Sequence, residues 1–254
     1  MSTTRMSRRL RRLLLLLPCL LVAVGTASNT EAQPVRIGVQ AGPSFAFLSD
    51  SATPFSTGTP RTNANLRLTL QAGIHLVVPL TEHLALQPEL RYLQKGGHFS
   101  QPLTERYTVE RYRFSYLQGA VLLRPSVPIP GPLSLHFVAG LTVDRALGGT
   151  AQRNVHSAEN NFATRVALQD PGYLRRWDLG GILGAGLSYP IGTESRVALT
   201  LRYNPGFRSA FVQSEPSASR EAGDTFPLSS SLPSLRHDVI TAGLSYTLPV
   251  ASLF

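Results

Sequence analysis

The sequence predicts an all-β fold, an eight-stranded antiparallel transmembrane up-and-down β-barrel. The first observation is the alternation from Leu66 to Val78, where every second residue is apolar and those between are mostly polar or small. Successive side chains of a strand point to opposite faces, so this segment is a strand with one apolar face. The second observation is that such strands are joined alternately by short and long connections. This spacing is typical of outer-membrane barrels with short periplasmic turns and long extracellular loops.

Eight segments carry the strand pattern, and an even number places both termini on the periplasmic side. They cover residues 35–47, 65–79, 84–95, 111–124, 133–144, 177–189, 196–204 and 237–248. The short connections are 80–83, 125–132 and 190–195, and the long ones are 48–64, 96–110, 145–176 and 205–236. Ala-Gly recurs in mid-strand at 41–42, 72–73, 139–140, 185–186 and 242–243. Glycine at such positions lets interior groups approach the barrel wall.

The N-terminus is predicted to be a secretory signal peptide over residues 1–32, which leaves residues 33–254 as the barrel domain. It has a basic start, an apolar run from Leu13 to Val24 and small residues before Ala32. Without it the chain keeps 19 basic and 14 acidic residues, so the net charge falls from +9 to +5 and no nucleic-acid partner is needed. Cys19 is the only cysteine, so the mature chain has no disulfide or thiolate chemistry. No later segment is apolar enough for a transmembrane helix, which leaves a closed barrel as the spanning structure.

One hairpin resembles a known family. Residues 71–99, QAGIHLVVPLTEHLALQPELRYLQKGGHF, resemble the outer-membrane β-barrel family that includes PorT. The resemblance continues in order through YLQGAVLLR (116–124), FVAGLTV (137–143), LGAGL (183–187), LTLRYNPG (199–206) and VITAGLSY (239–246). The family often has YLEIPLLLKY where this chain has YLQGAVLLRP, and it carries no shared catalytic residues. The resemblance therefore implies a fold and a location, and no activity.

The inner faces of the predicted strands collect charges, which we expect to form a packed ion-pair network inside the barrel. An eight-stranded barrel is too narrow for an open channel, and buried charges need partners. A gated ion path is the alternative role. The candidates are Arg67, Glu89, Arg91, Lys95, Arg113, Asp144, Asp178 and Arg202, with Arg36 and Asp238 on the same phase. No histidine pair has metal-ligand spacing, so we expect neither a metal nor a cofactor.

The inward phase of segment 111–124 is the least constrained. We place Arg113 and Ser115 inward, with Tyr112, Phe114 and Tyr116 facing lipid. Residues 120–123 are apolar on both faces and fit either phase.

The function expected from this pattern is structural or surface-binding, without catalysis. Binding residues concentrate in loops, and guanidinium groups bind phosphate and carboxylate well. The expected partners are outer-membrane lipid and lipopolysaccharide, an extracellular loop ligand, and the barrel-assembly machinery, which prefers a C-terminal aromatic such as Phe254. The protein is expected to be a monomer. Arginines in or beside the long loops are Arg106, Arg111, Arg153, Arg165, Arg175, Arg176, Arg208 and Arg220.

Two other functions fit parts of the sequence. An outer-membrane lipid-modifying enzyme, an acyl hydrolase or transferase, needs a serine activated by histidine near the outer rim. His98 with Ser100, or His156 with Ser157 and Glu159, are candidates for this role. A soluble barrel of the lipocalin type needs a polar outer face, whereas here the alternate positions stay apolar along whole strands.

Overall fold

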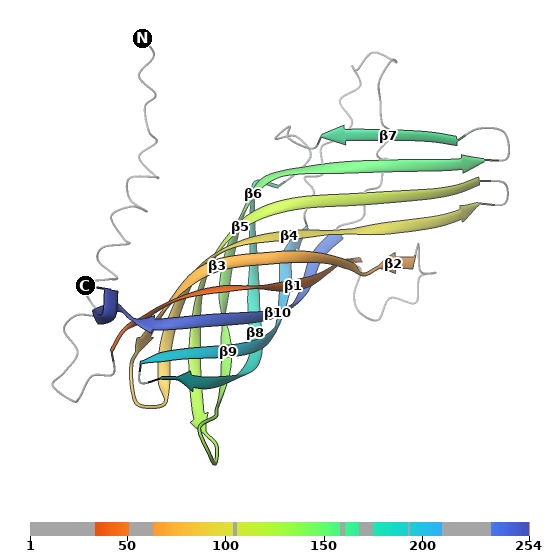
Figure 1. Cartoon of the computed structure of the whole chain (residues 1–254). Coiled ribbons are helices and arrows are strands. Elements are labelled where there is room, and N and C mark those ends of the chain that lie inside the picture. The colour runs from red at the N-terminus through yellow and green to blue at the C-terminus, as the bar shows by residue number, and fades with distance from the viewer. Residues whose placement is uncertain are drawn as a thin grey trace, which may run out of the picture. The chain divides into compact units, whose positions relative to one another are not determined.

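Eight strands close into one antiparallel barrel, as the sequence predicts (Figure 1). The computed structural model describes residues 34–50, 63–103, 106–157, 161–167, 175–192, 194–209 and 235–253. Around the ring the order is β1, β3, β4, β5, β6, β8, β9, β10 and back to β1, and every neighbouring pair is antiparallel. The ring strands are β1 (Arg36–Asp50), β3 (Arg67–Pro79), β4 (Leu84–Leu103), β5 (Arg106–Pro128), β6 (Ser134–Ser157), β8 (Trp177–Ile191), β9 (Ser195–Ser209) and β10 (Leu235–Pro249).

The two ends of the barrel differ. One end, here called the turn end, holds the connections 80–83, 129–133 and 192–194 together with the paired residues Arg36 and Pro249. A short 3₁₀ helix, Val250–Leu253, follows there, and the Val250 amide donates to the Val35 carbonyl over 2.8 Å. The opposite end is called the loop end. In the described part of the chain, no helix has the length and apolarity to cross a membrane. The predicted signal peptide and Phe254 lie outside the described residues.

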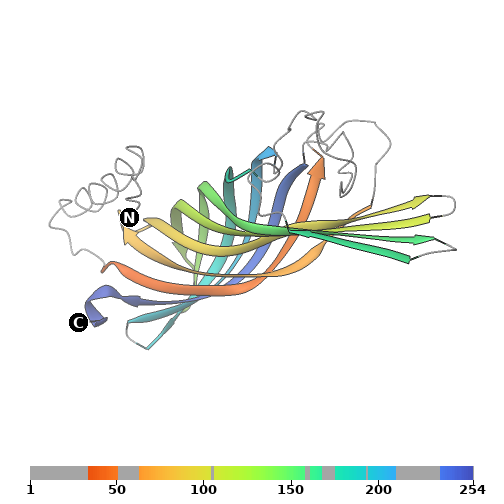
Figure 2. The same cartoon turned by 90° about the horizontal axis from the view of Figure 1, so that it is seen from above.

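Strands β4, β5 and β6 continue far beyond the ring at the loop end. They have 20, 23 and 24 residues, whereas the other ring strands have 13 to 15. Two short strands join this extension, because β2 (Asn63–Asn65) pairs with β4 and β7 (Asn161–Ala167) pairs with β6. Figures 1 and 2 show β4, β5, β6 and β7 projecting side by side as a flat layer. We call this layer the projecting sheet.

The projecting sheet corrects the prediction that residues 96–110 and 145–176 are loops. Most of the described residues in these two ranges are paired strand. A sheet that leaves the membrane no longer needs one apolar face, so the alternation that marks strands in the sequence disappears there. Strand β6 pairs with β8 up to Arg145 and with β7 from Thr150 onward. Gly148, with φ +155°, lies between these two paired stretches. Residues with a Cβ rarely adopt this φ, so glycine suits the transition.

The outer face of the ring is an apolar belt. Its side chains are exposed although they are large and hydrophobic; Leu70 and Leu141, for example, are each 69% exposed. Monomeric soluble proteins rarely expose so large an apolar surface. Further members of the belt are Val39, Leu68, Ile74, Leu90, Leu117, Val121, Leu123, Phe137, Leu183, Leu187, Leu199, Leu201 and Leu244.

The inner face mixes polar groups with apolar clusters. One cluster joins Ala120 and Leu122 of β5 to Val138 and Ile182, and a second is formed by Ala46, Leu93 and Val239. Leu122 is fully buried, which fixes the inward phase of β5 on even-numbered residues. The barrel interior is therefore a packed core and the outer face is the hydrophobic surface.

Candidate functional site

Six of the eight predicted interior charges are buried on inner faces of the ring. They come from four different strands, so the barrel's closure is what brings them together. They are Glu89, Arg91 and Lys95 of β4, Asp144 of β6, Asp178 of β8 and Arg202 of β9.

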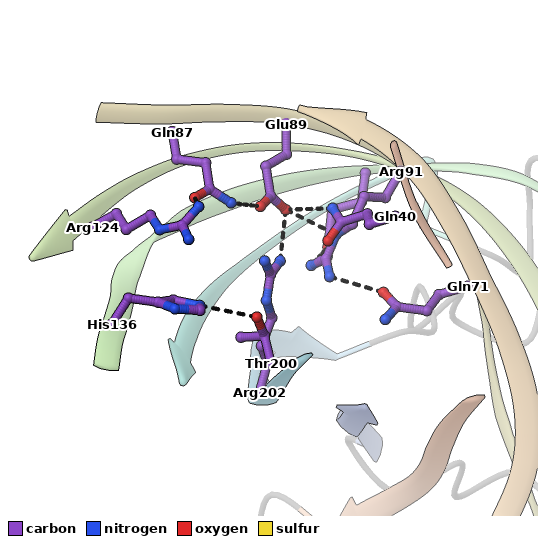
Figure 3. A network of polar contacts seen from close by, with 10 residues as sticks. Gln40, Gln71, Gln87, Glu89, Arg91, Arg124, His136, Thr200 and Arg202 are labelled. Carbon is purple, nitrogen blue, oxygen red and sulfur yellow. Dashed lines mark hydrogen bonds and ion pairs between the residues drawn. The ribbon is translucent and has the colours of Figure 1, made fainter. Parts of the chain in front are cut away.

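Glu89 is the centre of the larger network (Figure 3). Its Oε2 accepts from Arg202 Nη1 at 2.8 Å and lies 3.3 Å from Arg91 Nε. The same oxygen accepts from Gln40 Nε2 at 3.1 Å, and Oε1 accepts from Gln87 Nε2 at 2.5 Å. One carboxylate thus serves two guanidiniums and two amides, which satisfies a charge that would otherwise be unfavourable inside the barrel.

Arg91 spreads the network across β3, β4 and β5. Its Nη1 donates to Gln71 Oε1 at 3.0 Å, and its Nη2 donates to Gln118 Oε1. Directly across the strand pair stands Gly73, where a Cβ would lie 2.7 Å from Arg91 Cγ. The absence of a side chain at Gly73 is therefore what lets the arginine lie against the wall.

A second branch runs from Arg124 to His136. Arg124 donates from Nη1 to Gln87 Oε1 at 3.0 Å and from Nη2 to Ser188 Oγ at 3.1 Å. His136 is hydrogen-bonded through Nδ1 to Ser188 Oγ and through Nε2 to Thr200 Oγ1, each at 3.0 Å. Its imidazole also faces a glycine, because a Cβ on Gly186 would lie 2.7 Å from two ring atoms.

Lys95 and Asp144 form a separate ion pair toward the loop end. The Lys95 ammonium also lies 4.8 Å from the centre of the Tyr116 ring, a distance suited to a cation–π contact. Tyr116 and His237 meet edge to face with centroids 5.7 Å apart, and the Tyr116 hydroxyl lies 3.4 Å from His237 Nε2. Asp178 is the cross-strand partner of Asp144, and its Oδ1 accepts the Leu179 amide at 2.8 Å.

Arg113 was predicted to face the interior, and the structure shows this to be wrong. Its side chain is exposed, while Tyr112, Phe114 and Tyr116 fill the interior instead. The reason is side-chain volume. Three aromatic rings pack the lumen near Lys95 and His237, whereas Arg113 and Ser115 in the same place would leave the lumen polar and loosely filled.

Arg67 and the two further candidates of the same phase, Arg36 and Asp238, make contacts of their own. Arg67 is half-buried and donates from Nη1 to the Tyr112 carbonyl at 2.8 Å. Arg36, at the turn end, donates to the Glu194 carbonyl at 2.9 Å. Asp238 accepts from the hydroxyl of Tyr203, whose ring is exposed on the outer face.

Sequence reasoning missed the polar residues that complete the networks. Gln118 and Arg124 are six residues apart, and this even spacing places both on one face of β5. Reading the phase of β5 from these two residues would have turned the aromatics inward and Arg113 outward. The others missed are Gln40, Gln71, Gln87, Ser188, Thr200 and Tyr116.

The residues proposed for acyl chemistry are not brought together by anything the structure describes. His98 and Ser100 fall on β4, and His156 and Ser157 on β6, but their side chains and Glu159 lie outside the described part. Among the described residues, no group of three or more His, Cys, Asp or Glu side chains is arranged to hold a metal. Of the loop arginines, Arg106 and Arg111 are on β5, Arg153 is on β6 and Arg165 is on β7, whereas Arg220 is not described.

A closed ring of strands with an apolar outer belt and an interior of ion pairs and aromatics defines a membrane-spanning β-barrel. Residues 27–212 match the outer membrane protein beta-barrel domain, and the chain belongs to this family. Its class is thus that of the bacterial outer-membrane barrels. The match supports the resemblance noted in the sequence at this general level, and a specific relation to PorT stays a prediction.

Solved structures similar to this chain are other outer-membrane proteins, at very low identity. Neisserial surface protein A (NspA) is 10% identical, with 87% of this chain and 99% of that chain covered and a TM-score of 0.40. AlkL in lipid bilayers is 12% identical, with 89% and 95% covered and a TM-score of 0.42. Ail of Yersinia pestis is 9% identical, with 85% and 100% covered and a TM-score of 0.33. No curated protein sequence matches the chain.

Proposed function

We propose that this protein is a non-catalytic barrel of the outer membrane that presents the projecting sheet as a binding surface outside the cell. The observation that carries the proposal is the length of β4, β5 and β6, which exceeds that of the other ring strands by up to about ten residues. A strand of about 9–11 residues is enough to span a bilayer. At about 3.3 Å per residue, ten extra residues extend the sheet by roughly 30 Å.

The interior supports a role at the surface over a role in transport. Glu89, Arg91, Leu93 and Tyr116 are each at most 6% exposed, and they lie on the inner faces of β4 and β5. Eight-stranded barrels of this kind have interiors filled by side chains. Recognition is then left to the loop end, where the projecting sheet extends beyond the ring.

Outward-facing arginines support an accompanying contact with lipopolysaccharide. Arg111, Arg113 and Arg145 are exposed on the outer faces of β5 and β6, and we call them the arginine band. Leu117, Arg145 and Trp177 are cross-strand neighbours, and the Arg145 guanidinium lies 5.9 Å from the Trp177 ring. Tryptophan is typical of the membrane interface, so Arg145 beside Trp177 would meet phosphate groups of the outer leaflet. Arg113 and Arg111 follow farther along β5 toward the loop end.

Cysteine labelling in intact cells tests the orientation. The only cysteine is Cys19, in the predicted signal peptide, so single substitutions give clean reporters. We expect a membrane-impermeant maleimide to label Gln152→Cys, on β6 beyond the ring, in intact cells. Glu82→Cys, in an exposed turn, should react only after lysis. Labelling of Glu82→Cys in intact cells would show that the projecting sheet does not face outward.

The lipopolysaccharide contact has its own test. The purified barrel should unfold at a higher denaturant concentration in lipopolysaccharide micelles than in uncharged detergent. The R113Q/R145Q variant should lose most of this difference. T81D lowers the net charge at an exposed turn of the turn end and should keep it. Equal losses in the two variants would mean that net charge, and not the arginine band, determines the effect.

A further inference from the structure

Three arginines face inward at the turn end, and neither proposed surface uses them. Arg36 begins β1, Arg196 is the second residue of β9, and Arg124 lies near the end of β5. Each shares the inward phase of its strand with buried residues, namely Gln40, Thr200 and Leu122. We call these three residues the arginine mouth.

Strand register brings the arginine mouth together. Thr247 of β10 is the cross-strand partner of Gly38 on β1 and of Arg196 on β9, so Gly38 and Arg196 lie at the same level on either side of β10. Arg36 is the next inward-facing residue of β1 beyond Gly38. Arg36 also reaches the turn that precedes β9, through its hydrogen bond to the Glu194 carbonyl.

Arg124 approaches the same place from the opposite wall. Its Nη2 donates to Ser188, whose cross-strand partner on β9 is Ala198, two residues from Arg196. The hydrogen bonds that Arg124 makes among the described residues go to neutral oxygens, those of Gln87 and Ser188. A guanidinium has five N–H donors, so these two bonds leave it able to bind a further acceptor.

Positive charge dominates the surroundings of Arg124. The charged groups whose fields reach it are Arg202, Arg196, Arg36 and Glu89. Glu89 is already shared between Arg91 and Arg202. Like charges confined in a poorly hydrated site are unfavourable unless an anion joins them. Arg36 is only half-buried and Arg196 is exposed, so an anion can enter from the turn end.

We propose that the arginine mouth binds a phosphate group between Arg36, Arg124 and Arg196. Guanidinium forks match phosphate oxygens in geometry and charge. The group can come from free inorganic phosphate or from the head group of a phospholipid at the barrel rim. This site is distinct from the projecting sheet and the arginine band, and it does not depend on which way the barrel faces.

The full mature protein, folded in uncharged detergent, is titrated with inorganic phosphate while 31P line width and unfolding temperature are recorded. Sodium chloride at equal ionic strength is the reference. We expect saturable binding to the wild type and at least tenfold weaker binding to R124Q and to R36Q/R196Q. R176Q removes an exposed arginine that belongs to neither the arginine mouth nor the arginine band, and it should bind as the wild type. E194Q removes the carboxylate that acts on Arg36 and should bind more tightly.

Short-chain phosphatidylglycerol, added to the same micelles, separates the two phosphate sources. If a lipid head group is the natural ligand, this lipid should bind at least tenfold more tightly than inorganic phosphate, and the arginine substitutions should weaken both. R36Q/R196Q changes partly exposed residues, so it remains informative if R124Q does not fold. Equal binding by the wild type and R36Q/R196Q, or no saturation beyond the chloride reference, would overturn the proposal. Neither result would bear on cysteine labelling at the loop end.

Discussion

The substitution Glu89→Gln tests the interior network most directly. Glu89 Oε2 lies 2.8 Å from Arg202 Nη1 and 3.3 Å from Arg91 Nε, so its removal leaves two buried guanidiniums without their carboxylate. The charge-assisted hydrogen bond from Arg202 contributes about 1.5–3 kcal/mol, and the ion pair with Arg91 adds to this value. Removing one partner of a buried ion pair costs about 3–5 kcal/mol in other proteins. We therefore expect E89Q to lower the free energy of unfolding by about 3–5 kcal/mol.

Trp177 makes the measurement possible. It is the only tryptophan and is 53% exposed on the outer face, so its fluorescence reports transfer from detergent to water during urea unfolding. E82Q, at an exposed turn carboxylate, is the matched control and should stay within about 0.5 kcal/mol of the wild type. In E89Q/R202Q the loss should be smaller than the sum of the two single losses, because the partners are in contact. A loss below about 1 kcal/mol in E89Q, or simple additivity, would refute the view that Glu89 holds these arginines.

The remaining predictions use the same unfolding measurement. K95M leaves Asp144 without its ammonium, and we expect a loss of about 3–5 kcal/mol; a change under 1 kcal/mol would mean that water replaces the lysine. G186V places a branched side chain against the His136 ring, and this overpacking should lower the free energy of unfolding by about 1–3 kcal/mol. G192A changes a turn glycine that has open space around it, so it tests the effect of backbone strain alone. R113Q changes an exposed outward residue and should alter the stability in uncharged detergent by less than about 0.5 kcal/mol; a loss like that of K95M would restore its predicted interior position.

The sequence was sufficient where one face of a strand meets lipid. From Leu66 to Leu76 the apolar and polar positions alternate, and the structure places the odd residues Thr69, Gln71 and His75 inside. All eight ring strands are found this way, because burial on one side and lipid on the other impose a period of two. The paired segments of β5 and β6 beyond the ring meet neither condition, and their polar composition led to the prediction of loops.

The interior was harder to predict because its packing is not uniformly polar. On β5 the apolar run 120–123 removes the contrast between faces, so the predicted phase rests on residues 112–116. The charge of Arg113 predicts that the odd-numbered residues face inward, yet the aromatic side chains of Tyr112, Phe114 and Tyr116 fill the interior there. The sequence also could not predict which interior charges pair with each other, since Glu89 binds Arg202 on a strand more than a hundred residues away.

Gly73 facing Arg91 and Gly186 facing His136 have a consequence for how this barrel can evolve. In each pair the two residues share one space, so a larger residue on one strand requires a smaller one on its neighbour. Replacing the glycine first passes through a clash, and replacing the large residue first opens a void beside partly unpaired polar groups. Substitutions at these positions should therefore appear as coupled exchanges in related chains, with each pair inherited as a unit.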